Sequence, residues 1–204
     1  MPLFILDYGN PLYDNGLPPS SEAGIRAFAE YATYVVSKFD KDGDIIWEIW
    51  NEPNIEFFWK PKPNAMQYAE LLKATLEAIR SASSNAVLIA PATSGVNIEF
   101  IERLLKMRAL RGIDAVSVHP YRGSNPESMV TDYRRLREIL SRYGFNLPVV
   151  CSEWGYSTWS MRNLCEKTGS LCSEDVHNEF DGRDTYNDNL RLERRRAGHK
   201  RCRA

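Results

Sequence analysis

The sequence has no long hydrophobic run and no excess of charge of either sign. None of its apolar stretches approaches the ~20 residues that span a bilayer, and the short run over residues 86–90 is typical of them. Its 26 lysines and arginines almost balance its 27 aspartates and glutamates, which leaves a net charge of −1. A protein that binds nucleic acid or an anionic membrane surface would carry a basic excess. We therefore expect neither nucleic acid nor a membrane as a partner.

Cysteine is also scarce, with four residues in a chain of 204, too few for a disulfide framework. Cys151 lies in an apolar run, where a buried and inert thiol is expected. The other three, Cys165, Cys172 and Cys202, match no standard zinc-ligand spacing. The sequence also has no phosphate-binding loop and no dinucleotide fingerprint. We expect no metal and no cofactor.

The sequence does have the hydrophobic content of a globular domain, at 43% hydrophobic and 11% aromatic residues. Apolar β-prone runs alternate with segments in which apolar residues recur at helical spacing. The expected strands are 3–6, 45–50, 87–90, 113–118 and 148–153. The expected helices are 22–39, capped by Ser20 or Ser21, then 65–82, 98–110 and 129–143. Pro91 is expected to close the third strand. This alternation predicts parallel βα units, but a closed barrel of eight units and about 250 residues does not fit.

The composition changes after Met161, where charged residues are dense and apolar residues are sparse. We predict a partial barrel domain over residues 1–160 and a polar, charged tail over residues 161–204. A disordered or solvated tail is the first interpretation. Residues 191–203 are strongly basic, so an arm for an acidic partner is one alternative. A segment foreign to the fold, translated past a break in the reading frame, is another.

Polar residues follow four of the expected strands, at the ends where reactive side chains project in βα barrels. They are Asp7 and Tyr8, Asn51 and Glu52, His119 and Tyr121, and Glu153 and Trp154. Two of these residues are glutamates on separate strands. A pair of carboxyl groups is the minimum machinery for cleaving a glycosidic bond, because one must donate a proton while the other stays ionised.

Four of the five tryptophans lie near these two glutamates in sequence, namely Trp50, Trp59, Trp154 and Trp159. Aromatic rings around a carboxylate pair supply apolar faces for the CH-rich sides of sugar rings. Trp59 has an alternative role in loop packing, and Tyr8 is either a subsite residue or part of the core. Trp47 is expected in the core against the helices. Glu48 is expected to be a structural ion-pair partner rather than a catalyst.

Three motifs resemble a known group of enzymes. The segment Trp-Glu-Ile-Trp-Asn-Glu-Pro-Asn over residues 47–54 is similar to the Asn-Glu-Pro motif that ends strand four in clan A glycoside hydrolases. The segment Ser-Glu-Trp-Gly over residues 152–155 resembles the strand-seven nucleophile motif, and Val-His-Pro-Tyr over residues 118–121 resembles the strand-six element. Within the clan, the chain most resembles family 39 and its relatives, with family 5 next. The resemblance covers roughly residues 3–160.

The resemblance implies an α/β fold of the (β/α)8 TIM-barrel type, incomplete, with about strands three to seven present. Strands one, two and eight would be missing, and the chain would start inside the family's domain. The sequence shows no signal peptide, but family members are often secreted or periplasmic, so the localisation stays open.

The resemblance also implies roles for individual residues. Glu52 would be the general acid/base, and Glu153 would be the nucleophile of a retaining double displacement. Asn51 would bind the 2-hydroxyl of the sugar. Either His119 or Tyr121 would hydrogen-bond Glu153 or the substrate. For each residue the plainer alternative is a structural role, such as a helix cap for the glutamates or a satisfied loop histidine for His119.

Two further residues complete the expected substrate-binding set, because Trp154 would line the sugar subsite and Tyr8 would lie beside it. The expected activity is hydrolysis of O-glycosidic bonds in a β-linked oligo- or polysaccharide. An inactive truncated remnant is one alternative, because catalysis needs carboxyl groups held in place and an open arc leaves strand edges unpaired. A non-catalytic carbohydrate-binding protein is the other.

Overall fold

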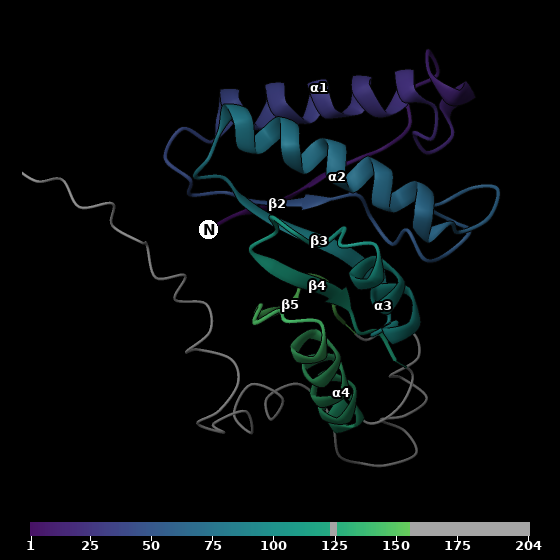
Figure 1. Ribbon diagram of the computed structural model, residues 1–204, viewed down its shortest axis with the longest axis vertical. Coiled ribbons are helices and arrows are strands. Elements are labelled where there is room, and N and C mark those ends of the chain that lie inside the picture. Colours follow the sequence, from purple (N-terminus) through teal and green to yellow (C-terminus); the bar gives the residue numbers. More distant parts are fainter. Residues whose placement is uncertain (123–125, 156–204) are drawn as a thin grey trace, which may run out of the picture. The chain divides into compact units, whose positions relative to one another are not determined.

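The computed structural model describes residues 1–122 and 126–155, and its strands and helices alternate along the chain (Figure 1). The elements are β1 (Leu3–Leu6), α1 (Glu22–Phe39), β2 (Ile46–Ile49), α2 (Ala65–Ala82), β3 (Val87–Ser94), α3 (Ile98–Lys106), β4 (Ala115–His119), α4 (Met129–Arg142) and β5 (Val149–Cys151). Two short 3-10 turns cover Asp14–Gly16 and Pro126–Ser128. The tail predicted over residues 161–204 lies outside the described residues.

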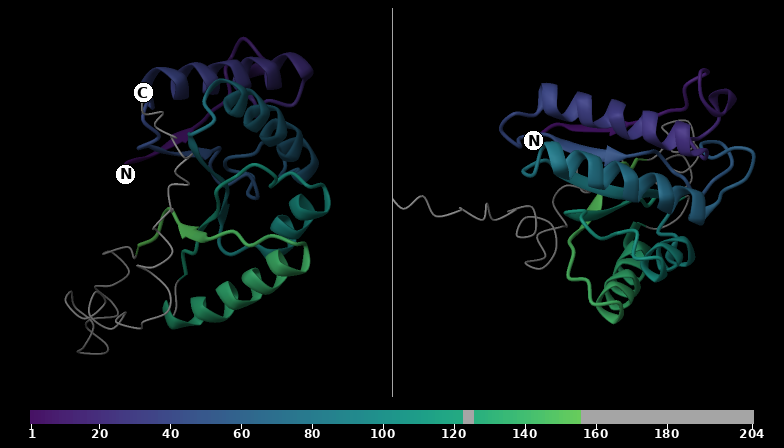
Figure 2. Two further views of the ribbon diagram at one scale, coloured as in Figure 1. Left: turned by 60° about the vertical axis from the view of Figure 1, so that its left-hand side comes forward. Right: turned by 45° about the horizontal axis from the view of Figure 1, so that its top comes forward.

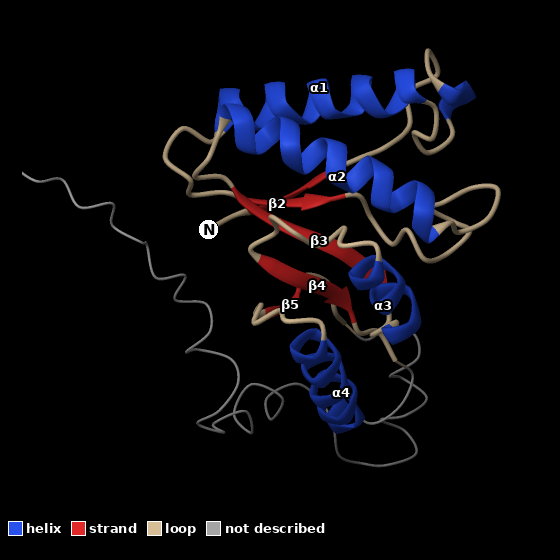
Figure 3. Ribbon diagram, in the orientation of Figure 1, coloured by secondary structure: helices blue, strands red, loops and turns tan. Residues whose placement is uncertain are grey.

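The five strands form one parallel sheet in the order β1-β2-β3-β4-β5. The helices lie along one face of the curved sheet, and the other face has none in the described part of the chain (Figures 2 and 3). One edge of β1 and one edge of β5 have no partner strand among these residues. The predicted incomplete α/β barrel type is therefore confirmed.

The main hydrophobic core lies between the sheet and the helices. Trp47 and Ile49 of β2 point to this side and are buried, as are Leu72 and Ile79 of α2. Burying one such side chain contributes about 1.5–3 kcal/mol. Trp47 also donates a hydrogen bond from Nε1 to Oδ2 of Asp40 at 2.9 Å, so the predicted core position of Trp47 is correct.

The opposite face of the sheet is apolar at the amino ends of the strands. Ile46, Ile89 and Ala115 form a small buried cluster there. Because side chains alternate along a strand, Glu48 lies on the same face as Ile46, two residues nearer the carboxyl end. The inner face therefore changes from apolar to polar along the strands.

Side-chain caps explain where three of the helices begin. Oγ of Ser21 accepts from the backbone N–H of Gly24 at 3.0 Å, and Oδ1 of Asn97 accepts from Phe100 at 2.9 Å. Oδ1 of Asn64 accepts from two backbone N–H groups at the start of α2, at 3.0 and 3.2 Å. Each cap satisfies donors that an isolated helix leaves unpaired.

Two predicted boundaries are wrong. Strand β3 continues through Pro91 to Ser94, and its register with β4 shifts between Ala90 and Thr93. Proline, which has no N–H, is tolerated at such an irregularity. Helix α3 ends at Lys106 rather than at residue 110, since Arg108 adopts φ +55° and turns the chain out of the helix.

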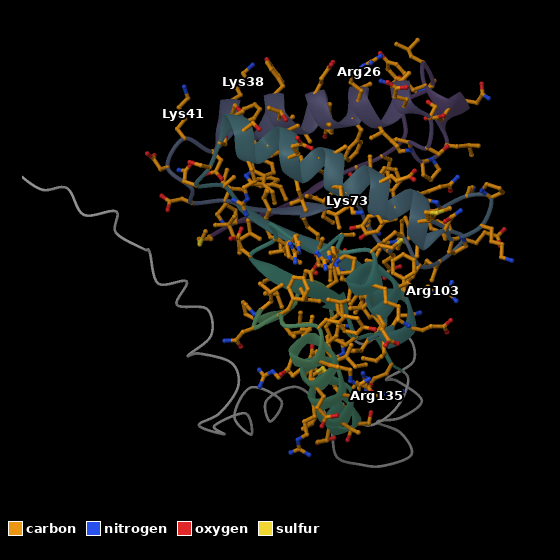
Figure 4. The ribbon with its side chains drawn as sticks, viewed as in Figure 1. Arg26, Lys38, Lys41, Lys73, Arg103 and Arg135 are labelled. Carbon is orange, nitrogen blue, oxygen red and sulfur yellow. The ribbon has the colours of Figure 1, made fainter. Side chains whose placement is uncertain are left out.

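Several exposed basic residues lie on the helices α1 to α4. Figure 4 shows labelled side chains such as Arg26, Lys38 and Arg135 pointing away from the sheet. Among the helices of the described residues, none has both the length and the apolar character needed to cross a membrane.

Candidate active site

The chain that follows β2 is held tightly between its two neighbouring strands. The backbone N–H of Trp50 donates to the carbonyl of Leu6 at 2.9 Å, and that of Glu52 donates to the carbonyl of Ala92 at 3.0 Å. Trp50 and Glu52 adopt φ values of +68° and +43°. Side chains other than glycine rarely adopt this region, which costs about 1–3 kcal/mol per residue and is concentrated at functional sites.

Asn54 fixes the same loop to the end of β3. Its amide group donates to the carbonyl of Ser94 at 3.0 Å and accepts from the Ser94 N–H at 2.8 Å. The side chain thus pairs with the strand as a backbone group would. This contact gives the last residue of the Asn-Glu-Pro-Asn segment a positioning role for the loop.

Three glutamates surround His119, which ends β4 and is fully buried. Nδ1 of His119 lies 3.1 Å from Oε1 of Glu52 and 3.7 Å from Oε2 of Glu153. Nε2 lies 3.7 Å from Oε2 of Glu48. The carboxyl ends of β2, β4 and β5 thus meet at one imidazole ring.

The shared contact with Nδ1 limits the separation of Glu52 and Glu153. The two oxygens can be no more than about 7 Å apart, the sum of their distances to that nitrogen. This upper limit on the distance between the two oxygens is compatible with the ~5–5.5 Å separation of the carboxyl groups in retaining glycosidases.

The charge state of His119 follows from these neighbours. Burial opposes the charged form, but the interactions with Glu48 and Glu52 and the charge of Glu153 outweigh it and raise the pKa of His119 to about 9. The imidazole is therefore protonated at neutral pH. A cation lies between carboxyl groups that would otherwise repel one another.

Tyr121 reaches the site from the loop after β4. Its hydroxyl donates to Oε2 of Glu153 at 3.4 Å, and its side chain is half exposed. Burial, together with the charge and the hydrogen bond of Glu153, raises the pKa of Tyr121. The phenol consequently remains a proton donor to Glu153, whose side chain is 36% exposed.

Tyr8 lies beside the same carboxyl groups, at the end of β1. Burial, then the charge and hydrogen bond of Asp7, and then the charge of Glu153 raise the pKa of Tyr8 to about 12, against a smaller opposite effect of Asn51. Its ring is half exposed and stacks on Phe58 at 5.9 Å. Asn51 is buried, and its Oδ1 has no hydrogen-bond partner among the residues described.

A hollow of about 430 Å³ adjoins Tyr8. Its walls include the rings of Tyr8, Trp50, Phe57 and Phe58, with Lys60 also in the lining. A larger hollow of about 870 Å³ lies between α1 and α2. Its lining shares no residue with the site, whereas Tyr8 lines the smaller hollow and lies near Glu153 and Asn51, so the smaller hollow is the one that bears on the site.

The tryptophans that lie near the two glutamates in sequence occupy different environments in the structure. Trp59 is buried, packs edge-on against Trp50 and Tyr68, and donates from Nε1 to Gln67 at 3.4 Å. Its role is loop packing, and it offers no face to a sugar. Trp154 is partly exposed next to Glu153, and Trp159 lies outside the described residues.

Glu48 was not among the predicted site residues, although its position in the sequence could have indicated it. It follows Ile46 by two residues and precedes Glu52 by four, so strand alternation points it to the inner face. Within residues 1–122 and 126–155, no group of three or more metal-ligating side chains could hold a metal ion.

Comparisons with known proteins identify relatives of this chain. The family model for cellulase (glycosyl hydrolase family 5) matches residues 4–183. A β-xylosidase of Geobacillus stearothermophilus is 33% identical over 90 residues, which is 43% of this chain and 18% of that protein. The chain thus spans less than a fifth of that relative.

Two solved structures have the same arrangement of strands and helices. One is a family 39 enzyme from Xanthomonas axonopodis pv. citri, with 22% identity and a TM-score of 0.56 over 66% of this chain and 31% of that chain. The other is a family 39 β-xylosidase from Caulobacter crescentus, with 27% identity and a TM-score of 0.54 over 65% of this chain and 30% of that chain. The expected clan A kinship, with relatives in families 39 and 5, is confirmed. This chain belongs to the glycosyl hydrolases of the cellulase family, family 5, in clan A.

Proposed function

We propose that the chain hydrolyses O-glycosidic bonds of a β-linked glycan by a retaining double displacement. Glu52 is the general acid/base and Glu153 is the nucleophile. The observation that best supports this proposal is the contact of both carboxyl groups with Nδ1 of His119, at 3.1 and 3.7 Å. Because the chain covers less than a third of its solved relatives, the activity is proposed for this chain and not transferred from them.

The reaction has two displacement steps. In the first, the carboxylate of Glu153 attacks the anomeric carbon while Glu52 gives its proton to the departing glycosidic oxygen. The bond to the leaving group breaks as the bond to Glu153 forms, which gives a glycosyl ester. In the second, Glu52 takes a proton from water, the water oxygen bonds to the anomeric carbon, and Glu153 leaves as a carboxylate. Two inversions return the original configuration.

Neighbouring residues would assist both steps. The Tyr121 hydroxyl donates to Glu153, which orients that carboxyl group. Asn51 would hydrogen-bond the 2-hydroxyl of the sugar, a contact that strengthens in the transition state. Tyr8 and Trp154 would contact the sugar ring. Two similar proteins are named β-xylosidases, so a β-xyloside is the first substrate to test.

Two alternative functions are distinguished by the experiments described below. A non-catalytic carbohydrate-binding role is favoured by the exposed rings of Phe57 and Tyr8, which are 75% and 50% exposed. An inactive remnant is favoured by the unpaired edges of β1 and β5.

A mechanism-based inactivator tests the catalytic proposal. The full chain is incubated with a 2-deoxy-2-fluoro-β-xyloside that carries a good leaving group, and the adduct is located by intact-mass and peptide mass spectrometry. We expect one adduct, on Glu153, because the fluorine slows hydrolysis of the glycosyl ester more than its formation. Glu153→Gln should prevent labelling. The matched control Glu99→Gln, on the exposed face of α3, should not.

The other outcomes each have a distinct reading. An adduct on another residue, or no adduct from xylosyl, glucosyl or galactosyl reagents with folded protein, would contradict the catalytic proposal. Sugar binding that is unchanged by Glu52→Gln and Glu153→Gln would support the carbohydrate-binding role instead. A broad, non-cooperative thermal transition would support the remnant, whereas a sharp one would exclude it.

A further inference from the structure

The imidazole of His119 bridges two carboxyl groups on opposite sides of the ring. Nδ1 faces Oε1 of Glu52 at 3.1 Å, and Nε2 faces Oε2 of Glu48 at 3.7 Å. Nε2 of His119 and Oε2 of Glu48 are both buried, and neither has a hydrogen-bond partner in the described part of the chain. Nε2 of His119 and Oε2 of Glu48 therefore face each other as the nearest available polar partners.

Glu48 is itself held in place by a residue from another strand. The hydroxyl of Ser152, directly after β5, donates to Oε1 of Glu48 at 2.7 Å. This leaves Oε2 for His119. Glu48 is fully buried, and its register partners on the two adjacent strands are Ile5 and Ile89. No lysine or arginine of the described residues lies within ion-pair distance of it.

The chemistry of these atoms determines where the imidazole carries its protons. A carboxylate oxygen accepts hydrogen bonds, and a buried one such as Oε2 of Glu48 is costly to leave without a donor. Glu48 therefore favours a proton on Nε2 of His119. With Nε2 protonated, Nδ1 is the nitrogen that can gain or lose a proton, and Nδ1 is the atom that faces Glu52.

We propose that Glu48 is a positioning residue for the acid/base: it fixes a proton on Nε2 of His119, so that Nδ1 and Glu52 share a single proton. When Glu52 is protonated, it donates to Nδ1 of the neutral ring. When the shared proton is on Nδ1 instead, the ring donates it to the Glu52 carboxylate and holds that group in the same orientation. The proton leaves the pair with the glycosidic oxygen in the first displacement step, and Glu52 regains one from water in the second. This inference rests on the proposed function for the role of Glu52.

The groups that face His119 come from three places in the fold. Glu48 belongs to β2, Glu52 to the loop after β2, and Glu153 to the segment after β5. All three are acidic, so removing the charge of Glu48 leaves two of them in place. The pKa of about 9 for His119 agrees with this surrounding charge, and we expect it to fall once Glu48 is neutral.

Nitrogen-15 NMR of the imidazole tests the proposal directly. The chain has three histidines, so the full chain is prepared with His177→Asn and His199→Asn, which leaves His119 as the sole imidazole signal. At pH values above the transition, the neutral ring should be the Nε2–H tautomer. A neutral ring with its proton on Nδ1 would overturn the proposal without any change at Glu48.

The same NMR measurement on the Glu48→Gln variant is the second part of the test. In Glu48→Gln, the amide oxygen can still accept from Ser152, while the amide NH2 donates to Nε2. We expect the pKa of His119 to fall from about 9 toward 6.5, by about one pH unit or more, and the neutral ring to switch to the Nδ1–H tautomer. The matched control Glu77→Gln, exposed on α2, should change neither. An unchanged pKa and tautomer in Glu48→Gln would overturn the proposal.

These readouts separate the positioning role from a structural one and from the proposed function. A purely structural Glu48 would change the melting temperature but not the tautomer. The NMR measurement needs no substrate, so failure of the Glu153 labelling would contradict the glycosidase activity alone. With an active chain, Glu48→Gln should also move the alkaline limb of the kcat/KM pH profile to lower pH, and an unmoved limb would contradict the role of Glu48.

Discussion

The two faces of β2 differ sharply although they share a four-residue strand. Trp47 and Ile49 pack under the helices, where Trp47 also reaches Asp40. Ile46 and Glu48 face the other way, where Glu48 meets His119 and Ser152. All four residues are buried. Burial on one face therefore contributes packing energy, while burial on the other strengthens the electrostatic interactions of charged groups.

The two faces of the sheet therefore have different roles, because one contributes to stability and the other carries the candidate site. The helix-facing side of the sheet is a continuous apolar layer. At the carboxyl ends of the strands, Glu48, Glu52 and Glu153 form an acidic cluster around one cation, His119. Substitutions on the two sides should accordingly affect different measurements.

The largest expected effect comes from the acidic cluster. Glu52→Gln keeps the shape of the side chain but removes the proton that the leaving oxygen needs. We expect kcat/KM for an aryl β-xyloside with a poor leaving group to fall about 10²–10⁴-fold. The rate for a substrate with a very good leaving group should fall much less, because such a group departs without a proton. Equal losses for both substrates would contradict the acid/base role of Glu52.

On the helix-facing side, Leu72→Ala should affect stability instead. Leu72 of α2 is fully buried in the main core, and its truncation leaves a cavity. We expect the free energy of unfolding to fall by about 2–5 kcal/mol in urea titrations. The pKa of His119 in the folded protein should not change. A shifted pKa would mean that the two faces are coupled, contrary to the comparison.

The charge of His119 predicts how stability depends on pH. Its pKa is about 9 in the folded protein against an ordinary value of 6.5, so the folded state binds the proton more tightly. The stabilisation is complete below about pH 6.5 and is lost as the pH rises to about 9, by at most about 3 kcal/mol. Urea titrations across this range should show the decline. The decline should be absent in His119→Asn, and its persistence there would assign it to other groups.

The smallest effect is expected at a helix end remote from the cluster. Asn64→Ala removes the acceptor for two backbone N–H groups at the start of α2. We expect a loss of about 1 kcal/mol in the free energy of unfolding. The neighbouring exposed residue serves as control, because Met66→Ala should change stability by less than about 0.5 kcal/mol. Equal losses in the two variants would argue against the cap.

Features set by local sequence were predicted well. The spacing of apolar residues indicated α2 as it is observed, and the two serines before α1 indicated a cap at Ser20 or Ser21, which lies at Ser21. Pro91 misled the prediction, because proline usually ends a strand whereas here it lies within an irregular register against β4. That register depends on a neighbouring strand, which no local pattern reveals.

Some residues of the candidate site could likewise be predicted from local sequence, and others could not. The rule that polar residues gather at strand ends pointed to Glu52, His119 and Glu153, which lie together in the structure. The role of Trp59 could not be read from its loop, since its burial depends on Trp50 and the distant Tyr68. The contact of Glu48 with Ser152 joins residues 104 positions apart, and sequence alone indicates only the face on which Glu48 lies.

The stereochemistry of the first product tests the central claim, that Glu52 and Glu153 act on opposite sides of one anomeric carbon. Proton NMR can follow the anomeric signals during hydrolysis of an aryl β-xyloside, before the released sugar equilibrates in water. We predict that the β-anomer appears first and the α-anomer only later, through mutarotation. Initial release of the α-anomer would contradict the double displacement, and so would the absence of any released sugar from folded protein.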